Sequence, residues 1–115
     1  MKKHDKIKKL HESFLLFFIF FLLFNMSGLV FAASLPQFSM SSYCKEVSEA
    51  VGGSYQIEQG CMENEKSSFN DLSRMDVPER IISYCTEVAN AVGGSYQILH
   101  GCVQNELEAK GQLNQ

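Results

Sequence analysis

The chain has 115 residues, with ten Lys and Arg against thirteen Asp and Glu, and a formal net charge of −3. This acidic balance lacks the basic footprint that gives proteins their non-specific affinity for DNA or RNA. We therefore expect no nucleic-acid partner, and anionic membrane surfaces are disfavoured for the same reason.

The first 32 residues have the pattern of a signal peptide. Residues 1–13 carry five Lys, residues 14–24 are an unbroken apolar run, and the small-residue exit Val30-Phe31-Ala32 follows. Cleavage after Ala32 would leave five cations and eleven acids, a net charge of −6. The alternative is an uncleaved membrane anchor, because the segment 14–33 is close in length to the roughly 20 residues that a spanning helix needs. Cleavage would place the mature protein in the periplasm or outside the cell.

The rest of the chain contains one unit twice. Residues 42–65 (SYCKEVSEAVGGSYQIEQGCMENE) recur as residues 83–106 (SYCTEVANAVGGSYQILHGCVQNE), with 17 of 24 positions identical at an offset of 41. The expected fold is all-α, with two tandem antiparallel helical hairpins. We place an approach segment at 33–40, the first hairpin at 41–72, a linker at 73–77 and the second hairpin at 78–115.

Glycine pairs and serines mark the turn of each hairpin. The first helix of each unit should end at its Gly-Gly pair, which supplies a left-handed C-cap, and Ser54 and Ser95 should cap the second helices. A short strand over Ser-Tyr-Gln-Ile is the alternative, but four residues are few for a stable strand pair. The hairpins either pack face to face or pair with other chains. The second helices should bury Ile57, Cys61, Phe69, Leu72, Leu99, Cys102 or Val103, Leu107 and Leu113.

The four cysteines occur as one C-x16-C pair in each unit. Both cysteines of a pair stand eight residues from the nearer turn glycine, so an antiparallel hairpin brings them to the same height, within disulfide reach. Gly60 and Gly101, beside the second cysteines, should let the helices approach closely. Four cysteines allow three connectivities, and the duplication favours pairing within each unit. The predicted disulfides are Cys44–Cys61 and Cys85–Cys102.

Other uses of these residues are less favoured. Zinc sites pair ligands two to four residues apart, and the sequence has no C-x-x-C, so we expect neither a metal nor another cofactor. His100, two residues before Cys102, is aligned with Gln59 and is interpreted as a surface residue. With no nucleophile–base pair, metal cluster or phosphate loop in the sequence, we expect no enzymatic activity.

Two further sets of repeated residues are candidates for a role. Glu65 and Glu106 should approach the start of the partner helix of their own hairpin, where an acid is favourable; a functional buried acid is the alternative. The matching hairpin ends are candidate partner-binding sites, because amphipathic aromatic side chains beside exposed turns often anchor interfaces. Alternatively, each tyrosine packs back over its own turn. These candidate residues are Tyr55, Gln56, Tyr96 and Gln97.

The pattern Tyr-Cys-x-Glu-Val, Gly-Gly-Ser-Tyr-x-Ile, Cys-x-x-x-Glu resembles one found in short exported bacterial proteins of unknown function, over residues 43–65 and 84–106. That resemblance implies a stapled helical unit and no particular activity. The plan is also similar to coiled-coil-helix hairpins with paired C-x9-C motifs, but the C-x16-C spacing differs, so their partners are not carried over. We expect a non-enzymatic interaction module that binds a protein partner, with a homo-oligomer as one form of that interaction; the alternative is a membrane-anchored accessory subunit.

Overall fold

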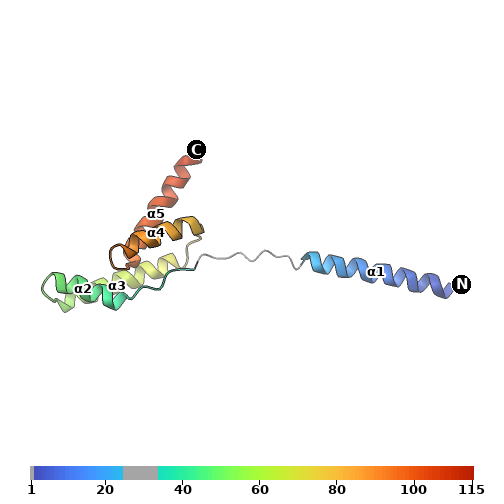
Figure 1. Ribbon diagram of the computed structural model, residues 1–115, viewed down its shortest axis with the longest axis horizontal. Helices are drawn as coiled ribbons and strands as arrows, with labels where there is room; N and C mark the ends of the chain where they lie inside the picture. Colours follow the sequence, from blue (N-terminus) through green and yellow to red (C-terminus); the bar gives the residue numbers. More distant parts are fainter. Residues whose placement is uncertain (1, 25–33) are drawn as a thin grey trace. The chain divides into compact units, whose positions relative to one another are not determined.

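The computed structural model describes residues 2–24 and 34–115, which divide into two units (Figure 1). The first is helix α1, Lys2–Phe24, whose side chains from Phe14 to Phe21 are exposed. Among the described residues, no helix combines the length and apolar character needed to cross a membrane. The expected cleavage after Ala32 lies outside the described residues.

The second unit consists of two helical hairpins, which confirms the predicted fold class. Helices α2, Met40–Ala50, and α3, Tyr55–Leu72, form the first hairpin; α4, Glu79–Asn90, and α5, Tyr96–Leu113, form the second (Figure 1). The hairpins also pack on each other through α3 and α5. Within the described residues all regular structure is helical, so Ser-Tyr-Gln-Ile is not a strand but a cap followed by the first helical residues.

The structure confirms the predicted turns and helix caps. Gly52 and Gly53 have φ of 101° and 81°, and Gly93 and Gly94 have φ of 97° and 85°, values that cost glycine little. The side chain of Ser54 accepts a hydrogen bond from the Ile57 amide, and that of Ser95 accepts one from the Ile98 amide. Each second helix therefore begins at a side-chain N-cap directly after a left-handed turn.

Both predicted disulfides are present. The Cα atoms of Cys44 and Cys61 are 5.5 Å apart and those of Cys85 and Cys102 are 5.6 Å apart, so the cysteines do meet at equal heights. Within the described residues no cysteine is free. Such bonds persist in oxidising compartments, which fits an exported protein.

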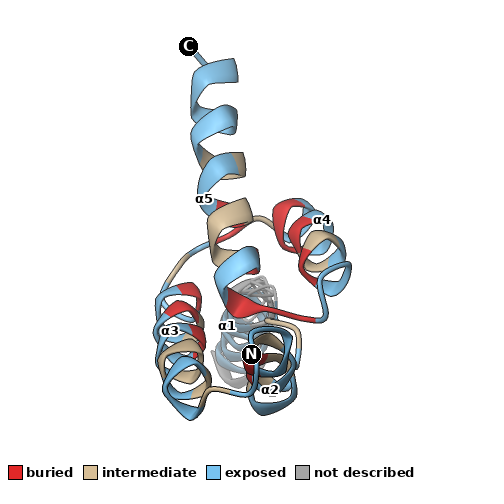
Figure 2. Cartoon of the chain, turned by 90° about the vertical axis from the view of Figure 1, so that its left-hand side faces the viewer, coloured by how far each residue is buried: buried red, intermediate tan, exposed pale blue. Residues whose placement is uncertain are grey.

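Figure 2 shows where the buried residues lie in the two hairpins. The apolar ones lie mainly in the second hairpin and at its junction with the first. Leu99 and Val103 of α5 are fully buried, whereas the aligned residues of α3 are Glu58 and Met62. In α2 the buried residues are Cys44 and Ser48, neither of them a large apolar side chain. The second hairpin thus has a core of its own, and the first depends on its disulfide and its neighbour. The apolar core of the two hairpins together consists of Leu72, Val77, Ile81, Ile82, Cys85, Ala89, Tyr96, Leu99 and Val103.

Three sequence expectations about packing are wrong. Ile57 is 42% exposed and Leu113 is 88% exposed, because Ile57 lies beside the turn of the first hairpin and Leu113 ends α5, where no other described helix packs (Figure 2). A Cβ added at Gly60 or Gly101 would meet nothing within 4 Å, so these glycines do not allow the close approach. The small buried residues one turn after the first cysteines, Ser48 and Ala89, lie on the side where the helices meet.

Replacing Gly60 or Gly101 with Ala should therefore stabilise the protein. Both glycines lie inside helices, where Ala is favoured over Gly by roughly 0.5–1 kcal/mol, and the added methyl group has open space. Chemical denaturation of the two oxidised variants would measure the gain. A loss of stability in either variant would mean that the position does contribute to helix approach.

Candidate functional site

The two hairpin ends have the same sequence and different surroundings. We call residues 52–56 the first tip and residues 93–97 the second tip; both read Gly-Gly-Ser-Tyr-Gln. Their glycine φ angles differ by only a few degrees, and the serine cap is the same. Any difference between the tips therefore comes from what lies against them.

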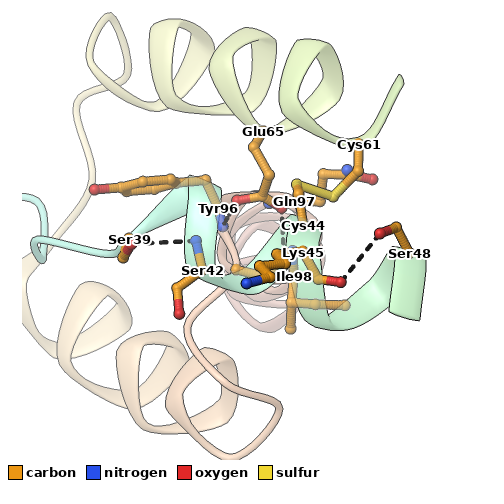
Figure 3. Close-up of a disulfide and its surroundings, with 11 residues drawn as sticks. Ser39, Ser42, Cys44, Lys45, Ser48, Cys61, Glu65, Tyr96, Gln97 and Ile98 are labelled. Carbon is orange, nitrogen blue, oxygen red and sulfur yellow. Dashed lines mark hydrogen bonds between the residues drawn. A yellow bond between two sulfur atoms is a disulfide. The ribbon is translucent and has the colours of Figure 1, made fainter. Parts of the chain in front are cut away.

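The second tip is held by a glutamate from the other hairpin (Figure 3). Glu65 of α3 is fully buried, and its carboxylate accepts hydrogen bonds from the Ser95 hydroxyl at 2.6 Å and the Tyr96 amide at 2.6 Å. The Gln97 amide donates a third, at 3.3 Å. These amides open α5, where backbone donors lack helical acceptors and the helix dipole favours an anion. Glu65 thus completes the N-terminus of a helix in the other hairpin.

Tyr96 is enclosed by aromatic and backbone groups of the first hairpin and its approach segment. Its ring centroid lies 4.9 Å from that of Phe38 and 5.0 Å from that of Phe69. Its hydroxyl donates to the Pro36 carbonyl at 2.8 Å and accepts from the Phe38 amide at 3.0 Å. A Cβ on Gly94 would lie 3.0 Å from the Phe38 ring, so the turn itself also packs closely.

Among the described residues, the first tip has no such neighbours. Tyr55 is 87% exposed, whereas Tyr96 is 3% exposed. Added Cβ atoms at Gly52 and Gly53 would meet nothing within 4 Å. The first tip therefore presents an aromatic ring and the free amides at the start of α3, and the exposed side chains of Val51 and Ile57 flank it.

These positions correct part of the predicted binding site. Tyr96 is not available to a partner, because the first hairpin and the approach segment bury it. It does not pack over its own turn either; it packs on the other hairpin. Tyr55, Gln56 and Gln97 have exposed side chains, and their role in binding stays a prediction.

Glu65 has a structural role that sequence reasoning placed on the wrong helix. The predicted position is the start of α2, but the hydrogen-bond partners of Glu65 lie at the start of α5 in the second hairpin. Its counterpart Glu106 is half-buried on α5, and its carboxylate has no hydrogen bond within the described residues. In the sequence, the only sign of a connection between Glu65 and the tips is that each unit contains both Gly-Gly-Ser-Tyr-Gln and a Glu that follows it.

Other features of the second unit are less specific. A groove of about 390 Å³ lies beside the approach segment, where Leu35, Phe69 and Met75 line it together with a single acid, Asp76. His100 is half-buried on α5. Across the described part of the chain, no three His, Cys, Asp or Glu side chains gather as metal ligands would. The two tips remain the arrangement that distinguishes this fold.

Comparisons with protein families, with curated proteins and with solved structures find no match to this chain. The resemblance to short exported bacterial proteins therefore stays an expectation from residues 43–65 and 84–106.

Proposed function

We propose that this protein is a small exported, non-enzymatic interaction module that binds a protein partner through its first tip. One observation carries the proposal: the second tip, with the same sequence and backbone, is a docked element, whereas Tyr55 of the first tip is 87% exposed. A sequence that docks in one place has the donors and the aromatic ring needed to dock in another.

The docked tip indicates the chemistry of such a partner. It would present a carboxylate to the amides and hydroxyl that open α3, and apolar or aromatic surface to Tyr55, as Glu65, Phe38 and Phe69 do for the second tip. Tyrosine suits this role because it combines a large apolar face with a polar end. The disulfides favour a location in an oxidising compartment, periplasmic or extracellular.

A photo-crosslinking amino acid in place of Tyr55 should form a covalent adduct in the compartment to which the protein is exported. The same group in place of Gln104, also exposed but on the side of α5, is the matched control. We expect an adduct from position 55 and none from position 104, both analysed by intact mass. Equal yields from the two positions, or none from either, would contradict a binding role for the first tip.

The mass of the unreacted protein in the same samples distinguishes a released protein from a membrane-anchored one. A mass that starts at Ala33 supports an exported, released module. A mass that includes residues 1–32 supports the alternative, a membrane-anchored accessory subunit held by its N-terminal helix. That alternative is kept because α1 carries exposed apolar side chains from Phe14 to Phe21.

A further inference from the structure

The contact that joins the hairpins uses only half of the repeated residues able to make it. Glu65 of the first unit binds the second tip. At the offset of 41, Glu106 is the second copy of Glu65, and the first tip is the first copy of the second tip. The internal contact therefore leaves one carboxylate on the second hairpin and one capping site on the first.

The unused capping site keeps the geometry of the used one. Ser54 accepts from the Ile57 amide at 3.4 Å, as Ser95 accepts from the Ile98 amide at 3.3 Å. As the first residues of α3, Tyr55 and Gln56 have amides with no acceptor inside the helix. In the second tip the corresponding amides are the ones that donate to Glu65. The ligand chemistry is thus observed within this chain: a glutamate carboxylate on a helix.

The second hairpin also keeps two of the side chains that face the docked tip. The second tip's Gly93 faces Tyr43 and Glu46 of α2. Their counterparts Tyr84 and Glu87 on α4 are identical residues, and both are exposed, Tyr84 by 53%. The surface of the second hairpin that corresponds to the observed docking surface therefore retains these two side chains in addition to Glu106.

Two substitutions make this second surface more polar than the first. Where Phe38 and Phe69 enclose Tyr96, the second hairpin has Glu79 and Lys110, both exposed. A docked Tyr55 would meet an acid and a base in place of two rings. The association should consequently be weaker than the internal docking, and reversible.

We infer that the first tip binds Glu106 of a second copy of this chain, by the contacts that Glu65 makes with the second tip. This inference rests on the proposed function and names its partner. The two surfaces of the contact are different, so it is heterologous, and each molecule that joins leaves a free tip at one end and a free Glu106 at the other. The expected assembly is a head-to-tail series that grows with concentration.

Two variants block opposite halves of this contact. Glu106→Ala removes the carboxylate and keeps the first tip. Tyr55→Pro removes the ring and the first amide and keeps Glu106. Proline is favoured at the first position of a helix, and Ser54 has the extended backbone, φ −79° and ψ 115°, that a residue before proline adopts. The proline variant should therefore fold. Glu106→Ala should also fold, because the carboxylate that it removes has no hydrogen bond within the described residues. Circular dichroism and intact disulfides would verify both.

Sedimentation velocity of the oxidised protein recovered from its export compartment tests the inference. The unmodified protein should show species larger than the monomer that increase with concentration. Each variant alone should associate at least about tenfold more weakly, the loss expected when a charge-assisted hydrogen bond is removed. An equimolar mixture of the two should form a one-to-one dimer and nothing larger, because each supplies the half that the other lacks.

The control is Glu108→Ala, an exposed acid two residues further along α5, which should associate like the unmodified protein. Strictly monomeric protein at every concentration would overturn the inference, as would association that survives both variants or a mixture that does no better than its components. A Tyr55-dependent adduct with a different protein, found together with a strictly monomeric chain, would leave the proposed function standing and remove this inference alone.

Discussion

Replacing Glu65 with Ala is expected to lower the free energy of unfolding by about 3–5 kcal/mol, because it leaves several buried donors without an acceptor. The Ser95 hydroxyl and the Tyr96 amide each donate to this carboxylate at 2.6 Å, and Ser95 is fully buried. For a domain of this size the loss corresponds to a fall in Tm of roughly 10–20 °C or more. It is a large share of the roughly 5–15 kcal/mol by which such domains are stable.

The matched control is Glu106→Ala, the same substitution at the repeated position. Glu106 is half-buried and has no hydrogen bond within the described residues, so its removal should change the stability of the monomer by no more than about 0.5 kcal/mol. Thermal and urea denaturation of dilute, oxidised protein would compare the two. Similar losses from both substitutions would show that Glu65 is not the connection between the hairpins.

Removing each disulfide in turn should show that the first hairpin depends on its disulfide more than the second does. Each bond closes a loop of 17-residue separation and should contribute about 3 kcal/mol on the chain-entropy model. In α2 the buried residues are Cys44 and Ser48, whereas α4 buries Ile81, Ile82 and Ala89 as well as Cys85. We therefore expect the double substitution of Cys44 and Cys61 with Ala to release α2 from the fold. The same change at Cys85 and Cys102 should leave α4 in place on a less stable protein.

Hydrogen exchange read by mass spectrometry would separate these outcomes. Protection of the α2 amides should fall roughly a hundredfold in the first double variant, the factor that corresponds to about 3 kcal/mol. Amides of α4 should keep measurable protection in the second. Unchanged protection of α2 without its disulfide would contradict this prediction. Packing of Tyr43, Val47 and the approach segment would then be enough to keep α2 folded.

The local structure could be predicted because it follows from residues close together in the chain. The glycine pairs end two helices, Ser54 and Ser95 begin two others, and equal distances from the turn bring each cysteine pair together. All of these rules act within about 20 residues, and the structure confirms them.

The contact between hairpins could not be predicted in the same way. Both tips have the same sequence, so nothing local indicates that Tyr96 is buried and Tyr55 exposed. The difference arises from residues outside the repeat: Phe38 and Phe69 enclose Tyr96. Comparing the positions just beyond the repeat, where Phe69 is aligned with Lys110, would have shown that the two surroundings differ.

The connectivity of the disulfides has a consequence for the order in which the protein matures. Each bond joins cysteines that are neighbours in the chain, first with second and third with fourth. When a chain enters an oxidising compartment from its N-terminus, Cys44 and Cys61 are both available before Cys85 has emerged. An oxidase that joins cysteines in order of arrival then forms the native pairs without later reshuffling. The first hairpin, once closed, provides Glu65 as a ready acceptor for α5, which emerges later.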